Sequence, residues 1–140
     1  MQFKKKRMRK LLFIIFIALP FMVAAQRFDF NVPRYRYGEY NDAKKDIVLG
    51  AWKAINTKAY VDYSAKLICI RPERPQYFTI LSFRSTNNEG GSTSVIFNCT
   101  DSNDYNCSVT FYFSLVSGKS TIIIFNPLLF EKYIYTITPV

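Results

Sequence analysis

The feature that most constrains the fold of this chain is a series of short runs rich in β-branched and aromatic residues, separated by turn residues. Such runs favour strands, and from residue 47 onward the pattern of an amphipathic helix is poorly developed. Short strands at regular spacing indicate an antiparallel barrel or sandwich. The predicted strands cover residues 48–56, 59–70, 76–85, 93–99, 107–116, 120–126 and 129–138.

Several of these runs alternate between apolar and polar residues, as half-buried strands do. In 107–115 the alternation places Val109, Phe111 and Phe113 on one face, and in 93–99 it places Phe97 beside Cys99. We therefore predict an all-β, antiparallel up-and-down meander barrel of about seven strands, with incomplete closure as an open alternative. An immunoglobulin-like sandwich is a further alternative, but Trp52 precedes every Cys, so the Cys-Trp-Cys order of that fold is absent.

The first 25 residues have the three-part pattern of a secretory signal peptide. A basic head at 4–10 precedes an uncharged apolar run at 11–23, and Val23-Ala24-Ala25 supplies the small residues that a signal peptidase reads. The apolar run is short for a membrane span, and Pro20 interrupts it. We expect residues 1–25 to be removed and the protein to be secreted, with a retained signal anchor as the alternative.

The mature chain would hold one domain with little net charge. Cleavage after residue 25 of 140 would leave 115 residues, enough for one core. Six of the 19 Lys and Arg lie before the cleavage site and all 10 acidic residues lie after it, so the mature net charge would be +3. Residues 26–46 are predicted to form an N-terminal arm, irregular or partly helical, and residues 47–140 the barrel domain.

The composition argues against catalysis and against nucleic acid binding. The chain has no His, which excludes Ser-His and Cys-His nucleophilic pairs and the commonest zinc sites. The nearest approach to a carboxylate pair, Asp101 and Asp104, lies in a polar turn and is interpreted as turn chemistry. The basic residues of the mature chain are scattered rather than clustered. We expect no enzyme activity, no metal, no cofactor, no nucleic acid partner and, after cleavage, no membrane partner.

The three cysteines suggest one disulfide. Cys99 and Cys107 flank a polar loop of seven residues, each on the apolar face of its strand, so we predict a bond between them in a hairpin. Cys69 then pairs with one of these two, is a buried free thiol, or lacks its partner. Asn98 and Asn106 begin N-glycosylation sequons, with side chains expected on the outer face.

Aromatic residues make up 17% of the chain, enough either to fill a small barrel or to line a cavity within it. In the last predicted strand Glu131 shares a face with Tyr133 and Tyr135. If that face points inward, Glu131 is a carboxylate in an apolar chamber and requires a cationic or hydroxyl partner. If it points outward, Glu131 is an ordinary surface charge. The predicted ligand-binding residues are Trp52, Tyr63, Phe97, Phe111, Phe113, Glu131, Tyr133 and Tyr135.

Gly50-Ala51-Trp52 resembles the Gly-x-Trp motif that opens the first strand of lipocalins, a family of eight-stranded ligand-binding barrels. The stretch from Tyr40 through Asn56, followed by Tyr60, Tyr63 and Cys69, is similar to the start of tick salivary lipocalins of the histamine-binding type. A bacterial lipocalin-like secreted protein is the second possibility. The resemblance implies a lipocalin-like barrel that takes a small amine or apolar ligand.

Two departures weaken the amine assignment. The resemblance implies an acidic side chain shortly before the Trp, and here the nearest is Asp46. The family's C-terminal strand and helix, which often carry a Cys partner for the Cys of the second strand, do not follow the last predicted strand. We expect a monomeric secreted carrier or scavenger. The alternative is an interaction protein with a filled core that binds a protein partner, for example of a host, through its loops or through Arg34-Tyr35-Arg36-Tyr37 in the arm.

Overall fold

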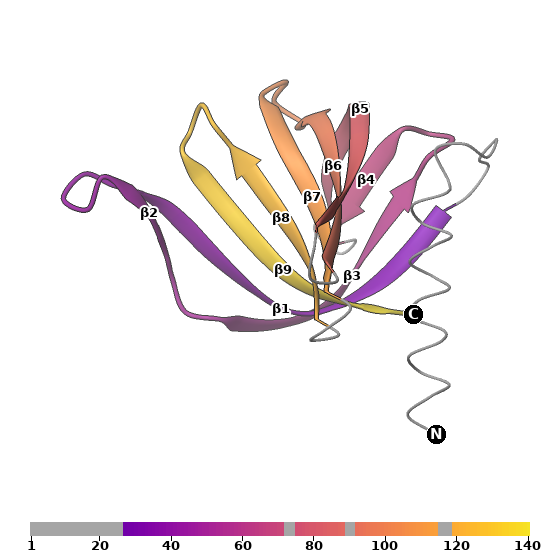
Figure 1. Ribbon diagram of the computed structural model, residues 1–140, viewed down its shortest axis with the longest axis horizontal. Coiled ribbons are helices and arrows are strands. Elements are labelled where there is room, and N and C mark those ends of the chain that lie inside the picture. The colour runs from indigo at the N-terminus through magenta and orange to yellow at the C-terminus, as the bar shows by residue number, and fades with distance from the viewer. Residues whose placement is uncertain (1–26, 72–74, 89–91, 115–118) are drawn as a thin grey trace.

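A computed structural model describes residues 27–71, 75–88, 92–114 and 119–140, so the predicted signal peptide lies outside the described residues. The sheet order is β2-β1-β3-β4-β5-β6-β7-β8-β9, and β1 pairs with β9 as well. Strands β1 and β3 to β9 therefore close into an eight-stranded antiparallel barrel with the predicted up-and-down connectivity (Figure 1). The strands are β1 (Arg27–Asn41), β2 (Asp46–Leu49), β3 (Lys53–Asp62), β4 (Leu67–Ile70), β5 (Gln76–Asn88), β6 (Ser92–Thr100), β7 (Asn106–Ser114), β8 (Ser120–Asn126) and β9 (Glu131–Pro139).

The predicted N-terminal arm is itself a strand of the barrel, so the expectation of an irregular or partly helical segment was wrong. β1 spans 15 residues and pairs along one edge with β3 and β2 and along the other with β9. Its alternation is broken by a register shift between Val32 and Arg34, around Pro33. Beyond the shift, Tyr35 stacks on the fully buried Tyr135 and so faces inward, although tyrosine reads as a half-polar residue in the sequence.

The predicted strand 59–70 is two strands joined by a tight turn. β3 ends at Asp62 and β4 begins at Leu67. The Asp62 carboxylate accepts hydrogen bonds from the Ser64 hydroxyl at 2.8 Å and from the Ala65 N–H at 3.1 Å. Lys66 then takes a positive φ of 52°. The apolar alternation continues through these turn residues, which is why the sequence reads as one strand.

The β1–β2 hairpin extends the barrel wall at one end and stands apart from the other strands in Figure 1. Gly38 lies opposite Leu49 in this hairpin and is buried. A Cβ atom on Gly38 would meet the Leu49 Cδ2 and the Val48 carbonyl oxygen, each at 2.8 Å. The hairpin therefore requires glycine there for close approach of the two strands.

The centre of the barrel is packed with apolar side chains. The Phe111 ring lies 5.7 Å from that of Phe30 and 5.6 Å from that of Phe97, both measured between centroids. These three rings and Val109 are buried, as the alternation predicted for Phe97, Phe111 and Val109. The strand interiors thus fill the middle of the barrel, and space for a ligand has to be sought at its ends. No helix among the described residues has the length and apolarity that crossing a bilayer requires.

Candidate binding site at one end of the barrel

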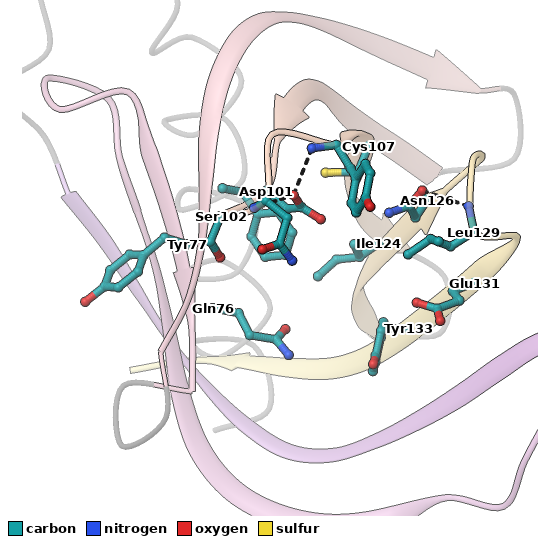
Figure 2. Close-up of a pocket in the computed structure, with 13 residues that line it drawn as sticks. Gln76, Tyr77, Asp101, Ser102, Cys107, Ile124, Asn126, Leu129, Glu131 and Tyr133 are labelled. Carbon is teal, nitrogen blue, oxygen red and sulfur yellow. Dashed lines mark hydrogen bonds between the residues drawn. The ribbon is translucent and has the colours of Figure 1, made fainter.

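A cavity of about 260 Å³ lies at the end of the barrel where β6 joins β7 and β8 joins β9 (Figure 2). The first residues of β5 form one side, the loop 101–105 a second, and the turn after β8 with the start of β9 a third. Its lining residues are Gln76, Tyr77, Phe78, Asp101, Ser102, Asn103, Tyr105, Cys107, Ile124, Asn126, Leu129, Glu131 and Tyr133.

Two polar side chains shape the loops around this cavity. Asp101 Oδ1 accepts hydrogen bonds from the backbone N–H groups of Asn103 at 2.9 Å and Tyr105 at 3.0 Å, which confirms the turn chemistry predicted for Asp101. Asn126 Oδ1 likewise accepts hydrogen bonds from the backbone N–H groups of Leu128 at 3.1 Å and Leu129 at 3.2 Å. Both loops are thus fixed by side-chain oxygens that mimic a backbone turn.

Glu131 lies on the inner side, so the inward alternative is the correct one. It lines the cavity and is partly buried, and in Figure 2 it lies beside Tyr133 and Leu129. Its carboxylate accepts a hydrogen bond from the Tyr37 hydroxyl of β1. Desolvation, followed by this hydrogen bond and the charge of Glu131, raises the pKa of Tyr37 to about 12. Tyr37 therefore remains a neutral donor to Glu131 over the physiological range.

Four tyrosines from β1 and β9 form a continuous stack below the cavity. Ring centroids of Tyr37 and Tyr133 are 4.7 Å apart, those of Tyr133 and Tyr135 are 6.1 Å apart, and those of Tyr135 and Tyr35 are 5.8 Å apart. Burial raises the pKa of both Tyr133 and Tyr135. The Tyr135 hydroxyl reaches the Gln76 Oε1 at 3.4 Å, a long contact between β9 and the start of β5. The stack gives the cavity a rigid aromatic side with neutral hydroxyl groups.

The charged side chains that line the cavity are of one sign. Asp101 and Glu131 contribute two carboxylates, and no Lys or Arg is among the described residues that line it. The Arg71 guanidinium lies outside the lining, 5.7 Å from the centroid of the Tyr35 ring, and its charge acts on Tyr133 of the lining. Because Asp101 already accepts two backbone hydrogen bonds, Glu131 retains more free acceptor capacity. The cavity therefore favours a ligand with a positive charge or several donors.

The predicted binding residues divide into four locations, of which the outer surface holds only Trp52 and is described separately. Glu131 and Tyr133 line the cavity, and Tyr135 lies directly below. Phe97 and Phe111 are core residues, with Phe113 packed against that core. Tyr63 follows β3 at the opposite end of the barrel, and its ring centroid lies 5.9 Å from that of Phe97.

Trp52 lies on the outer surface and does not line the cavity. Its side chain is 39% exposed. The guanidinium carbons of Arg34 and Arg36 each lie 5.3 Å from the centre of its ring. Arg36 Nε also donates to the carbonyl oxygen of Gly50 at 3.1 Å, which fixes one side of this arrangement. The motif at 50–52 therefore builds the outside of the wall here.

The predicted Cys99–Cys107 disulfide is absent, because the structure has both residues as free, buried thiols. The two residues do lie directly opposite each other in β6 and β7, as a hairpin requires. Directly opposed residues have Cβ atoms roughly 4.5–5.5 Å apart, whereas a disulfide needs roughly 3.5–4.5 Å. Cross-strand placement alone was therefore insufficient for a bond.

Cys69 is also a free thiol and is buried, which is one of the predicted alternatives. The turn after β3 reverses its face, so it lies between its strand partners Tyr60 and Tyr77 on the outer side of the sheet. Tyr60 hydrogen-bonds to Cys69, and the Arg27 guanidinium lies 3.7 Å from the centre of the Tyr60 ring. These side chains bury Cys69 although it points away from the core. Desolvation raises its pKa.

Both sequon asparagines are exposed, as predicted. Asn98 Nδ2 donates to the Ser82 hydroxyl at 2.9 Å, and Asn106 begins β7. Their use as glycosylation sites stays a prediction.

Sequence reasoning missed the cavity residues that come from other parts of the chain. Gln76, Asn126 and Tyr37 have no motif around them and meet only because the barrel closes. The Asn-Pro pair at 126–127 indicates a turn but not a lining residue. Within the described residues, no group of three His, Cys, Asp or Glu is placed to hold a metal ion. Comparison of the chain with protein-family models, curated proteins and solved structures finds no significant match.

Proposed function

We propose that this protein is a carrier or scavenger that binds a small organic cation, such as a biogenic amine, in the cavity at the end of its barrel. The observation that carries the proposal is the lining: two carboxylates and several aromatic side chains, with no Lys or Arg among the described residues. A carboxylate in a partly desolvated site favours a cationic partner, and aromatic faces attract cations further. Glu131 is the anchor, because Asp101 is engaged by its own loop.

The size and rigidity of the cavity support a small ligand. Sites for drug-sized molecules usually exceed about 300 Å³, and this one is about 260 Å³. The tyrosine stack and the two loops fixed by Asp101 and Asn126 hold the lining in place before any ligand arrives. A preformed site loses little conformational entropy on binding.

The test is calorimetric titration of the protein with histamine, serotonin and a long-chain fatty acid. Calorimetry is preferred to tryptophan fluorescence because Trp52, the only Trp, lies on the outer surface. We expect saturable binding of at least one amine. Glu131→Gln should weaken it about tenfold or more, because a charge-assisted hydrogen bond is lost.

Glu39→Gln is the matched control. Glu39 is the register partner of Glu131 across β1 and β9, so both variants remove one charge from neighbouring positions. Glu39 does not line the cavity, so its variant should weaken amine binding much less than Glu131→Gln does. Binding of the fatty acid alone, or equal losses in both variants, would contradict the assignment of Glu131 as a cation anchor.

The second candidate is an interaction protein with a filled core. The packed rings of Phe30, Phe97 and Phe111 favour it, since they leave the middle of the barrel without a chamber. Of the four arm residues predicted to bind a partner, Tyr35 and Tyr37 belong to the inner stack, and Arg34 and Arg36 lie outside against Trp52. Failure of all three ligands to give heat would favour this candidate.

We further propose that the chain is secreted after removal of residues 1–25, and that it is a diverged lipocalin. The support is the signal-peptide pattern and the closed eight-stranded barrel. The Gly50-Ala51-Trp52 motif adds none, because it lies between β2 and β3 and Trp52 is on the outer surface. Mass spectrometry of the protein recovered from a secreting host tests the cleavage site and any glycan on Asn98 or Asn106.

A further inference from the structure

The turn between β8 and β9 presents large apolar side chains to solvent. Leu128 is 65% exposed, Leu129 47% and Phe130 52%, three consecutive residues at one end of the barrel. Contiguous exposed apolar residues usually mark a site of contact. Phe130 also has a φ of 49°, a conformation that bulky residues rarely adopt. The turn therefore combines a strained backbone conformation at Phe130 with apolar side chains that are exposed to water.

Several backbone groups of this turn are paired within the protein. Pro127 has no N–H, and the N–H groups of Leu128 and Leu129 both donate to Asn126 Oδ1. The Phe130 carbonyl accepts from the Tyr40 N–H at 3.1 Å. Polar backbone groups that are already paired can leave water at low cost, which is what a low-dielectric environment demands.

A basic and aromatic surface continues from the turn along the outer wall. The ring of Tyr40 lies 5.5 Å from that of Phe130. Strand alternation places Arg34 and Arg36 on the outer face of β1 with Trp52 between them, and Lys132 on the outer face of β9. We call the residues Arg34, Arg36, Tyr40, Trp52, Leu128, Phe130 and Lys132 the outer patch.

No acidic residue lies on the outer face of β1 from Arg34 onward or on the outer face of β9. Alternation turns Glu39 and Glu131 to the inner side, where Glu131 lines the cavity. Among the described residues, the one ion pair is Arg27–Asp29, near the start of β1, so the three cations of the patch have no carboxylate partner. The outer patch has apolar side chains at the end of the barrel and cations without carboxylate partners further along the wall. It is therefore complementary to a layer with anionic groups on its surface and an apolar interior.

We propose that the outer patch docks this protein on an anionic lipid bilayer, with Leu128 and Phe130 inserted below the headgroups and Arg34, Arg36 and Lys132 on the phosphates. Trp52 and Tyr40 would then lie at the interface, where amphipathic rings are favoured. A second copy of the chain fits less well, because pairing two such patches would bring together cations with no acidic residue opposite them. This departs from the sequence-based expectation of no membrane partner, and it is independent of the amine site.

The test measures partition of the protein onto vesicles of phosphatidylcholine, with and without about one-third phosphatidylserine. Brominated lipids in the same vesicles report insertion directly, because Trp52 is the only Trp and lies in the patch. We expect binding to the anionic vesicles with quenching of Trp52, and much weaker binding to phosphatidylcholine alone. The apolar run 11–23 would bind lipid if retained, so all variants are compared in the same processed form and judged by Trp52 quenching.

Leu128→Ser should weaken partition about tenfold, since one leucine side chain no longer leaves water. Leu81→Ser is the matched control: Leu81 is 62% exposed, nearly the same as Leu128, but lies on β5 outside the patch. Arg34→Gln with Arg36→Gln should also weaken partition about tenfold or more and remove most of the preference for phosphatidylserine. Lys58→Gln with Lys66→Gln removes the same charge elsewhere and should change partition little.

The proposal is overturned if Trp52 is not quenched on anionic vesicles, or if Leu128→Ser and Leu81→Ser behave alike. It is also overturned if sedimentation shows a dimer that Leu128→Ser dissociates, since the patch would then be an interface between copies. Circular dichroism and urea unfolding of each variant verify that it is folded. Retention of amine binding by Leu128→Ser separates loss of docking from loss of the cavity, which Leu128 does not line.

Discussion

The thiols of Cys99 and Cys107 lie inside the barrel wall, and their protonation contributes to stability. Burial is the main cause that raises the pKa of Cys99 to about 12, and burial with the nearby Asp101 charge raises that of Cys107 to about 11. Both values lie above the ordinary thiol value of 9.0. The folded protein therefore keeps both thiols protonated at a pH where the unfolded chain has lost those protons.

The sign of the effect follows from linkage. A raised folded pKa gives stability that is complete below the unfolded pKa and is lost as pH rises toward the folded value. We expect the free energy of unfolding to fall by about 2–3 kcal/mol between pH 8 and pH 10 through these two thiols. Urea unfolding under reducing conditions measures it. A Cys99→Ala, Cys107→Ala double variant should lose less of its free energy of unfolding over the same pH range. An equal dependence of that free energy on pH in both proteins would contradict the interpretation.

At the scale of single residues, the sequence predicted part of the candidate site. Alternation in the last strand placed Glu131 with Tyr133 and Tyr135, and the structure brings these three together at one end. Trp52 was placed inside by its motif, yet it lies outside because two arginines of β1 hold its ring there. Motif and alternation describe one strand at a time, so contacts between distant strands escape them.

At the scale of elements, the β1–β2 hairpin depends on Gly38. We expect Gly38→Ala to lower the free energy of unfolding by about 1–3 kcal/mol, because its Cβ would meet backbone and side-chain atoms at 2.8 Å. Gly50→Ala is the control directly after β2, since a Cβ there would have its nearest neighbour, the Tyr37 carbonyl oxygen, at 3.3 Å. Thermal and urea unfolding measure both. Equal effects of the two substitutions would show that β1 and β2 can move apart at Gly38 at little cost in free energy.

The central strands were predictable because each buries one face. β6 and β7 alternate between core and surface almost throughout, so their period is visible in the sequence. β1 was missed because its bulge at Pro33 shifts the period and its inner face carries Tyr35 and Tyr37 in place of aliphatic residues. The turn after Asp62 was missed because its residues continue the alternation that a strand would show.

At the scale of the whole molecule, closure depends on β1. This strand contributes Phe30 and Val32 to the core and joins β9 to β3. The domain boundary predicted at residue 47 therefore cuts through the barrel. We expect a fragment of residues 47–140 to lack a cooperative unfolding transition, because it would expose two strand edges and part of the core.

A chain that begins at residue 27 is the comparison for that fragment. It retains every described strand and should unfold cooperatively in urea, with near-ultraviolet circular dichroism that reports fixed aromatic rings. A cooperative transition in the fragment 47–140 would mean that β1 is an accessory to a barrel that the other strands close by themselves.

The pairing of β1 with β9 has a consequence for chain order. Phe30 near the beginning of β1 is the register partner of Pro139 at the end of β9, so the two ends of the strand series lie side by side. In a closed ring of antiparallel neighbours, each strand touches the same two neighbours wherever the chain is cut. The strand pairings therefore do not depend on which strand comes first in the chain. Circularly permuted sequences, with the present ends joined and another loop opened, could encode the same set of pairings.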